Sequence, residues 1–331
     1  MPIEKLLIIP QNWLGDIVMS QALLKKIKFK KPNAIIDILV DSSFKELVER
    51  MPETNKVITL ECCHKELGLL KRYSVAKKIR GTYDQSIVLS RSLKSSLIPY
   101  LAKINIRTGE LGEARYVLIN DFKKFSKSSR RKTAYRYVSM FSDNIENLDL
   151  EEKYYPSLSK NIKNIQHLTE KFSLDLKRKI IIFAPGAAYG KSKMWPINKF
   201  IDLADKLNKE YLILILGGEN EKNIGKKIAE NENVINLCGE TSIVDALDLM
   251  HMSEYCVSND SGLMHLAAAT NTKSISIYGA TSPDLTPPLT NHKDIHYKRI
   301  SCSPCFKRKC VFGHYNCLEK IQVTDVLKSF K

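Results

Sequence analysis

Short runs of consecutive apolar residues, separated by longer stretches with the spacing of amphipathic helices, recur along most of this 331-residue chain. Residues 5–10 (KLLIIP) and 34–40 (AIIDILV) form the first two runs, and residues 16–30 between them place apolar side chains on one side of a helix. Strands that are apolar throughout are typical of parallel sheets covered by helices on both faces. The sequence therefore predicts an α/β protein built from doubly wound parallel sheets.

The alternating pattern is interrupted once, between residues 122 and 163, and it resumes at residue 179. The economical interpretation is two Rossmann-like units joined by a linker near residues 155–178, which suits the length of the chain. We place the N-terminal domain at residues 1–165 and the C-terminal domain, which ends in a short helix, at residues 166–331.

The chain has 52 Lys and Arg against 36 Asp and Glu, a formal net charge of +16 that favours nucleic acid, anionic lipid or phosphorylated substrates as partners. The densest basic stretch, residues 123–136, contains no acid and is either a solvated loop and helix face or a surface that meets phosphates. Its basic residues are Lys123, Lys124, Lys127, Arg130, Arg131, Lys132 and Arg136. Because neither a nucleic-acid-binding motif nor interleaved aromatic residues accompany them, we expect no nucleic-acid partner.

No apolar run approaches the roughly 20 residues of a membrane helix, and the N-terminus is a poor signal peptide, so we expect a cytoplasmic protein. Four of the eight cysteines are clustered with the spacing C-x2-C-x4-C-x6-C. In a cytoplasmic protein this cluster favours metal binding over disulfides, but the spacing is not that of a standard zinc site. A structural metal and plain thiols, of which plain thiols are favoured, both remain open for Cys302, Cys305, Cys310 and Cys317.

Ligands of doubly wound sheets bind at the carboxyl ends of the strands, so the residues that follow each strand are the candidates for function. Gly15 and Asp16 come shortly after the first strand. Asp16 is either the N-cap of the next helix or a carboxylate that accepts a proton from a substrate hydroxyl. The chain contains neither G-x-G-x-x-G nor G-x-x-x-x-G-K-[ST], which disfavours nicotinamide-dinucleotide and P-loop enzymes.

Two loops of the second half have the composition of phosphate-binding sites. Residues 185–196 (PGAAYGKSKMWP) combine lysines with small residues that let backbone N–H groups approach an anion, although a flexible lysine-rich loop is the alternative. Residues 259–269 follow a strand and begin a helix, for which Asp260 is the expected N-cap. Ser261 and His265 share one face of that helix, where His265 can donate a hydrogen bond to phosphate. These loops predict a nucleotide-diphosphate pocket.

In its motifs the chain resembles the family of ADP-heptose lipopolysaccharide heptosyltransferases, and within that family it is most similar to heptosyltransferase II. The resemblance covers nearly the whole chain, and only the combination of motifs is specific. It departs at Ala188 and Tyr189, where some relatives have hydroxyl residues, which leaves the backbone or Ser192 to make any contact there. The motifs are WLGDIVMS at 13–20, PGA at 185–187, KMWP at 193–196, SNDSGLMHLAAA at 258–269, YG at 278–279 and TSPD at 281–284.

The resemblance implies a GT-B fold, in which two Rossmann-like domains face a central cleft, the N-terminal one binding the acceptor and the C-terminal one the donor. It implies an inverting transfer of L-glycero-D-manno-heptose from ADP-heptose onto the heptose of the lipopolysaccharide or lipooligosaccharide inner core, with no cofactor and no catalytic metal. The partners would be ADP-heptose, a phosphorylated lipid A–Kdo–heptose acceptor and the anionic inner face of the inner membrane, where the protein would be peripheral. The alternatives are a GT-B transferase that uses another sugar nucleotide and, less favoured, a basic nucleic-acid-binding protein.

By position, the resemblance implies that Asp16 is the general base and that Lys193 binds the diphosphate. It implies further residues around each of the two substrates. The donor would be bound by Glu219, through the ribose, and by Thr241, Asp260, Ser261, Gly262 and His265, and the acceptor would be bound by Trp13, Gly15 and Ser20.

Overall fold

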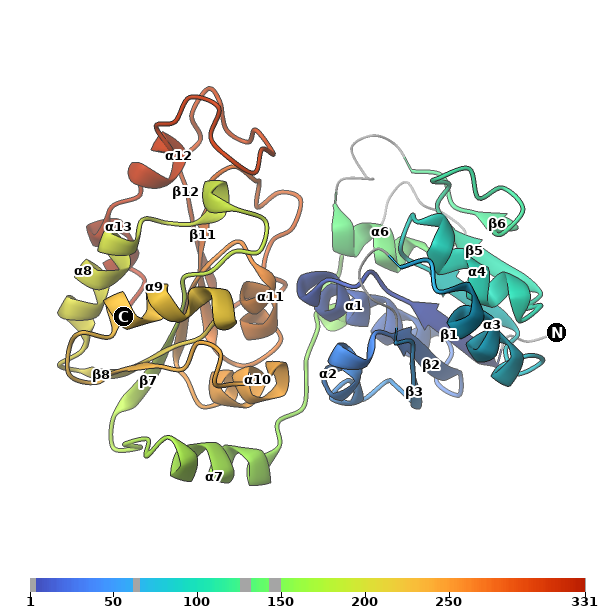
Figure 1. Cartoon of the computed structure of the whole chain (residues 1–331), viewed down its shortest axis with the longest axis horizontal. Coiled ribbons are helices and arrows are strands. Elements are labelled where there is room, and N and C mark those ends of the chain that lie inside the picture. Colours follow the sequence, from blue (N-terminus) through green and yellow to red (C-terminus); the bar gives the residue numbers. More distant parts are fainter. Residues whose placement is uncertain (1–3, 62–65, 126–131, 143–149, 331) are drawn as a thin grey trace. The chain divides into compact units, whose positions relative to one another are not determined.

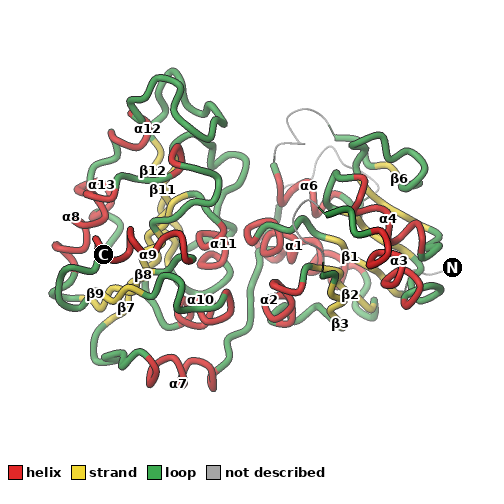
Figure 2. The backbone as a smooth tube through the Cα atoms, in the orientation of Figure 1, coloured by secondary structure: helices red, strands yellow, loops and turns green. Residues whose placement is uncertain are grey.

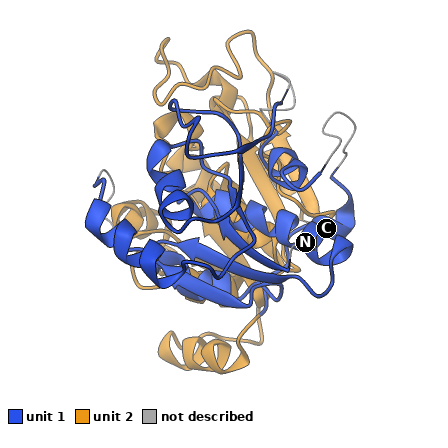
Figure 3. Cartoon of the chain, turned by 90° about the vertical axis from the view of Figure 1, so that its right-hand side faces the viewer, with its two compact units in different colours: residues 1–159 blue, residues 160–331 orange. Residues whose placement is uncertain are grey.

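The structure, a computed structural model, describes residues 4–61, 66–125, 132–142 and 150–330. It divides into two compact units, residues 1–159 (unit 1) and residues 160–331 (unit 2), which are coloured separately in Figure 3. The division precedes helix α7 (Ile162–Lys171), whereas the boundary expected from the sequence at residue 165 lies inside this helix.

Unit 1 is built on a six-stranded parallel sheet (Figure 1). The spatial order is β3-β2-β1-β4-β5-β6, so the chain changes direction across the sheet between β1 and β4. The strands are β1 (Lys5–Ile9), β2 (Ile35–Val40), β3 (Lys56–Thr59), β4 (Gln85–Val88), β5 (Ile106–Gly109) and β6 (Asp121–Phe122).

Unit 2 repeats this topology in a second six-stranded parallel sheet with the order β12-β11-β10-β7-β8-β9. Its corresponding change of direction lies between β7 and β10. The prediction of two doubly wound parallel sheets is thus confirmed. The strands are β7 (Lys179–Ala184), β8 (Tyr211–Ile215), β9 (Val234–Asn236), β10 (Tyr255–Asn259), β11 (Lys273–Tyr278) and β12 (Lys293–Tyr297).

Helices connect the strands in both units (Figure 2). In unit 1 they are α1 (Leu14–Lys30), α2 (Lys45–Glu49), α3 (Leu69–Lys78), α4 (Leu93–Leu101) and α6 (Thr133–Ser139), with short 3-10 turns η1 (Ser42–Phe44) and η2 (Glu152–Tyr154). In unit 2 they are α7, α8 (Ile197–Leu207), α9 (Lys222–Ile228), α10 (Ile243–His251), α11 (Gly262–Ala268), α12 (Asn316–Glu319) and α13 (Val323–Leu327), with η3 (Lys191–Lys193) and η4 (Glu219–Glu221). Within the described residues, no helix has the length and apolar character needed to cross a bilayer.

The central strands are buried on both faces, which explains their continuous apolar sequence. Leu6, Leu7 and Ile8 of β1 are completely inaccessible to solvent. Since neighbouring side chains of a strand point to opposite faces, both faces of the sheet must be covered. On one face, Ala76 of α3 and Ile98 of α4 belong to the same apolar cluster as Leu7.

The structure corrects the predicted elements where tertiary contacts outweigh local pattern. The predicted linker at residues 155–178 contains helix α7, which is held to α10 because the Asn164 side-chain amide donates to Asp245 and Asp248, both at 2.9 Å. The polar strand β12 (KDIHY) escaped prediction because its five residues are only partly buried or exposed, so they lack an apolar run. Helix α1 begins two residues before Asp16, at Leu14.

Candidate active site

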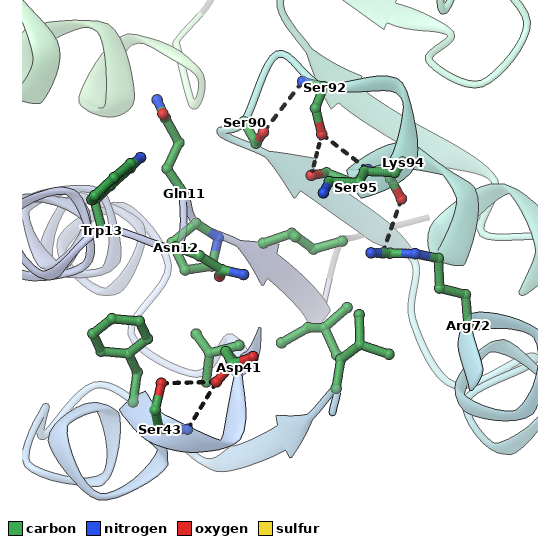
Figure 4. A pocket seen from close by; sticks show the side chains of 16 residues that line it. Gln11, Asn12, Trp13, Asp41, Ser43, Arg72, Ser90, Ser92, Lys94 and Ser95 are labelled. Carbon is green, nitrogen blue, oxygen red and sulfur yellow. Dashed lines mark hydrogen bonds between the residues drawn. The ribbon is translucent and has the colours of Figure 1, made fainter. Parts of the chain in front are cut away.

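A cavity of about 480 Å³ opens at the carboxyl ends of β1, β2 and β4 in unit 1 (Figure 4). Its walls come from the segments that follow these strands and from helices α3 and α4. The volume falls within the range of small-molecule sites, and the position at the change of strand order is where doubly wound sheets bind ligands. The polar lining residues include Gln11, Asn12, Trp13, Asp41, Ser43, Arg72, Ser90, Ser92, Lys94 and Ser95.

The cavity wall formed by α3 and α4 is basic and rich in hydroxyl groups. The buried Arg72 guanidinium is held in place because it donates to the carbonyl oxygens of Leu67 (2.8 Å) and Lys94 (3.0 Å). Lys94 lines the same wall, together with the hydroxyl groups of Ser92 and Ser95, which lie 2.8 Å apart. Two cations beside several hydroxyl groups suit an anionic, polyhydroxylated ligand such as a phosphorylated sugar.

Asp16 lies in the first turn of α1, three residues after Trp13, which lines the cavity. Asp16 is not the N-cap of this helix. The N-cap is Trp13, which has no side-chain capping bond, so the capping interpretation of Asp16 is wrong. The Tyr137 hydroxyl on α6 donates to Asp16 Oδ1 at 2.5 Å and accepts from Gln11 Nε2 at 3.1 Å. Burial, followed by the charge of Asp16, raises the pKa of Tyr137 well above its usual value, so the phenol remains a donor.

The three residues expected to bind the acceptor lie in different environments. Trp13 lines the cavity with about half of its surface exposed, and Gly15 lies in the first turn of α1. Ser20 is buried one turn further along α1, and its hydroxyl donates to the Ile17 carbonyl oxygen at 2.6 Å. Ser20 does not line the cavity, and its hydroxyl is engaged within the helix.

The basic stretch at residues 123–136 is not a single solvated face. Arg136 is buried on α6, where its guanidinium lies 3.5 Å from the Glu110 carboxylate and over the Tyr137 ring. Lys123 pairs with Asp121 at 3.5 Å. Lys124 and Lys132 are exposed, and Lys127, Arg130 and Arg131 lie outside the described residues.

In unit 2, the loops after three adjacent strands bring a buried ion pair together. Lys193 Nζ, in the loop after β7, lies 2.7 Å from Asp260 Oδ2, directly after β10. The Thr281 hydroxyl, after β11, donates to the same oxygen at 2.5 Å. Lys193 also lies over the Tyr189 ring, 5.1 Å from its centroid. A lysine ammonium has three donors, so this arrangement fixes the cation and leaves it able to bind an anion.

The start of α11 differs from the expectation in one respect: its N-cap is Ser261, and Asp260 instead holds Lys193 and Thr281. Within the described part of the chain, the buried Ser261 hydroxyl has no hydrogen-bond partner. Because it makes no bond within the described residues, this hydroxyl has a donor that a ligand at the start of the helix could use. His265 is buried one turn along the helix, and burial lowers its pKa to about 4, opposed by Asp260 and reinforced by Lys193.

The low pKa of His265 predicts an acid-sensitive fold. The imidazole binds its proton more weakly in the folded protein (pKa about 4) than in the unfolded chain (6.5), so its contribution is complete above pH 6.5 and falls as the pH is lowered towards 4. Between pH 7 and pH 5 the free energy of unfolding should fall by about 2 kcal/mol from this group. Urea unfolding at both pH values measures this loss, and His265→Gln should abolish that share of it. An unchanged pH dependence in His265→Gln would contradict the assignment.

Glu219 and Thr241 follow the next two strands of the sheet, away from the ion pair. Glu219 is 71% exposed on η4 and forms an ion pair with Lys222 at 2.9 Å, and Lys222 also pairs with Glu240 at 3.2 Å. Lys222 thus joins the loops after β8 and β9, and Thr241, which is partly exposed, follows Glu240 directly. A ligand spanning from Lys193 towards Glu219 would cross the ends of β7 and β8.

The cysteine-rich segment, residues 302–317, contacts the lysine-bearing loop, residues 185–196, and fixes its position. The hydroxyl groups of Tyr189 and Ser192 donate to carbonyl oxygens within residues 306–308. The Ser192 hydroxyl therefore does not make the ligand contact that the departure at residues 188 and 189 had left to it. Gly190 has a φ of 140°, and a Cβ there would lie 2.6 Å from the Arg308 carbonyl oxygen, so only glycine fits. The lysine loop is therefore built into the unit and is not freely flexible.

The four clustered cysteines line a small cavity of about 40 Å³ beside Ser192 and His314. Across the described residues, no set of three or more His, Cys, Asp or Glu side chains is placed to hold a metal ion. Cys238 and Cys256 are buried free thiols, and burial raises the pKa of each to about 12. Cys62 and Cys63 lie outside the described residues.

Comparison with known proteins decides the family. Residues 72–316 match glycosyltransferase family 9 (heptosyltransferase). The chain is 36% identical over 303 residues to lipooligosaccharide heptosyltransferase 2 of Haemophilus influenzae, covering 88% of this chain and 87% of that protein. The chain belongs to glycosyltransferase family 9.

Solved structures agree with this membership. The structure of Escherichia coli ADP-heptose lipopolysaccharide heptosyltransferase II is 32% identical with a TM-score of 0.83, covering 98% of this chain and 97% of that one. A family 9 glycosyl transferase from Veillonella parvula has a TM-score of 0.87 at 19% identity, a likeness of fold, over 99% and 97% of the two chains. The expected GT-B architecture and glycosyltransferase activity are confirmed for this family 9 protein, and heptosyl transfer is favoured over the alternative functions.

Several residues of the site gave no signal in the sequence. Tyr137 reaches Asp16 across 121 positions of the chain, and no spacing pattern connects them. Arg72 and Lys94 lie in helices with an ordinary amphipathic sequence, in which nothing marks either residue as part of a site. Thr281 was part of a motif, but only the structure shows that it contacts Asp260.

Proposed function

We propose that this protein transfers L-glycero-D-manno-heptose from ADP-heptose to the heptose of the lipopolysaccharide or lipooligosaccharide inner core, with inversion at the anomeric carbon. One observation carries the donor side of the proposal. Lys193, Asp260 and Thr281 form a buried cluster beside the unpartnered Ser261 hydroxyl, at the position where doubly wound sheets bind nucleotides. The family membership supports heptose as the sugar, because relatives named heptosyltransferases match most of the chain.

The proposed reaction is a single displacement. An acceptor hydroxyl oxygen attacks the anomeric carbon of the heptose, its proton passes to the Asp16 carboxylate, and the bond from that carbon to the diphosphate oxygen breaks. Tyr137 orients the carboxylate through its hydroxyl, which in turn accepts a hydrogen bond from Gln11.

The ADP leaving group gains negative charge as the bond breaks, and Lys193 is the cation assigned to it. Asp260 positions Lys193, while the Ser261 hydroxyl and neutral His265 are hydrogen-bond donors to the phosphates. We assign Glu219 and Thr241 to the nucleoside side, because they follow β8 and β9, which lie beyond β7 on the side away from β10. No step of this scheme requires a metal or an organic cofactor.

The cavity of unit 1 is the proposed acceptor site. Arg72 and Lys94 would bind the phosphate or carboxylate groups of the inner core, and Trp13 would pack against a sugar ring. Because such an acceptor is lipid-linked, we propose a cytoplasmic protein that associates peripherally with the anionic inner face of the inner membrane.

A donor-selectivity assay tests the proposal. The purified chain is given a delipidated heptose-containing acceptor and either ADP-heptose, ADP-glucose or UDP-glucose, and the product is analysed by mass spectrometry and NMR. We expect transfer only from ADP-heptose, with the anomeric configuration inverted. Equal kcat/KM with another donor would instead favour a GT-B transferase for a different sugar nucleotide, and a retained configuration would exclude the single displacement.

A further inference from the structure

The outer side of helix α3 in unit 1 exposes large apolar side chains. Leu70 is 86% exposed, and Leu69 and Tyr73 are each about half-exposed. Their spacings of three and four residues put them on one face of the helix, while Arg72 and Ala76 point into the unit. Contiguous exposed apolar residues of this size mark an interaction surface, because a solvated helix gains nothing from them.

The same outer side is basic. Lys71, Lys77 and Lys78 are exposed on α3, and this helix contains no acidic residue, although Glu66 just before it pairs with Lys71 at 3.3 Å. Lysine stems can lie along an apolar surface while their ammonium groups remain in the polar layer. Leucine and tyrosine flanked by lysines are the composition of helices that lie in the interface of an anionic bilayer. We call these six residues, Leu69, Leu70, Lys71, Tyr73, Lys77 and Lys78, the α3 face.

The α3 face is also close to the cavity of unit 1. Arg72 lies on the buried side of the same helix, lines the cavity, and donates to the Lys94 carbonyl oxygen at 3.0 Å, which ties α3 to α4 (Figure 4). A helix with its side chains is about 10–12 Å across, so the cavity wall and the exposed face are separated by about that distance. A ligand whose sugar occupies the cavity would therefore have its lipid within reach of the α3 face.

We propose that the α3 face docks on an anionic phospholipid bilayer, with Leu69, Leu70 and Tyr73 entering the headgroup layer and the lysines beside lipid phosphates. The bilayer is favoured over a second protein because apolar side chains lie beside lysines on this face, which complements a surface with both hydrocarbon and phosphate; Lys71 pairs with Glu66, which leaves Lys77 and Lys78 as the lysines without a carboxylate in the described contacts. The proposal rests on the proposed function only for the lipid nature of the acceptor.

The test compares vesicle binding of the full chain and of Leu70→Ser/Tyr73→Ser. Vesicles contain phosphatidylglycerol or consist of phosphatidylcholine alone, and binding is measured by co-sedimentation. We expect the double variant to lose about tenfold or more in partitioning onto phosphatidylglycerol vesicles, from the apolar area no longer buried. The matched control, Ile162→Ser/Leu176→Ser, removes two exposed apolar residues of unit 2 and should bind like the wild type.

Insertion is distinguished from adsorption by a second measurement. Leu70→Trp should show a blue-shifted fluorescence on addition of phosphatidylglycerol vesicles, and high salt should weaken the binding without abolishing this shift, because salt screens charge only. Equal vesicle binding of Leu70→Ser/Tyr73→Ser and wild type would overturn the proposal. A second outcome would also overturn it: a wild-type dimer in light scattering that becomes a monomer in the double variant. The α3 face would then contact a second copy of the chain.

Turnover on a delipidated acceptor separates this proposal from the function proposed above. The double variant should retain wild-type turnover there, because neither residue lines the cavity. If vesicle binding depends on the α3 face but the protein transfers no heptose, the docking proposal is supported and the proposed function is contradicted. If the protein transfers heptose but binds no vesicles, the proposed function is supported and the docking proposal is contradicted.

Discussion

Asp16→Asn is expected to lower kcat by about 100-fold or more, the usual scale for loss of a general base. Asparagine is isosteric and its side-chain carbonyl oxygen can still accept from Tyr137, so the fold and the affinity for ADP should be retained. What disappears is the ability to take the proton from the attacking hydroxyl. Steady-state kinetics with ADP-heptose and a delipidated acceptor measure the loss, and calorimetry with ADP checks that the donor site is intact.

Two further variants show whether the effect belongs to Asp16. Asp41 lines the same cavity after the neighbouring strand, but its carboxylate accepts from the Ser43 backbone N–H at 3.0 Å and caps η1. Asp41→Asn should therefore change kcat only slightly. Tyr137→Phe removes the hydrogen bond that orients the base and should cost roughly tenfold, the scale of a bond to a charged group. Near-wild-type turnover of Asp16→Asn would leave Asp16 without a catalytic role.

Lys193→Ala is expected to raise the Kd for ADP by about 10- to 100-fold, because the proposed charge-assisted contact to the diphosphate would be lost. It should also lower kcat if the same ammonium stabilises the leaving group. Lys191→Ala is the matched control, since Lys191 is exposed on the same 3-10 turn, and ADP affinity should be nearly unchanged. Calorimetric titration of ADP measures both variants.

Removal of Lys193 has a second consequence that must be separated from the first. The Asp260 carboxylate would remain buried without its cation, which costs about 3–5 kcal/mol for a buried pair and is enough to threaten the folding of the unit. Lys193→Met/Asp260→Asn removes both charges, and the Thr281 hydroxyl can still donate to the amide oxygen that replaces the carboxylate. Stability should therefore largely return while ADP affinity stays low. Recovery of ADP affinity in this double variant would show that Lys193 acts only through the fold.

Much of the candidate site follows from the chain alone because its parts are local. A residue placed just after an apolar strand of a parallel sheet must lie at the sheet's carboxyl edge, and this holds for Lys193, Asp260 and Thr281. The position of residues 185–196 and 259–269 after strands therefore predicts the proposed donor side from the sequence alone. The N-cap role, one of two alternatives for Asp16 and the expectation for Asp260, is wrong for both, and their carboxylates instead contact Tyr137 and Lys193.

The class of fold, the two doubly wound units and the loops proposed to carry the chemistry are predictable from the chain alone, because hydrophobic periodicity and strand-end position are properties of neighbouring residues. Which distant side chains meet follows from the folded structure alone. It paired Arg136 with Glu110 in the interior, brought Tyr137 to Asp16, and placed Arg72 in a cavity wall. Such contacts depend on the packing of whole elements, and a charge's burial or exposure follows from that packing rather than from its neighbours in the chain.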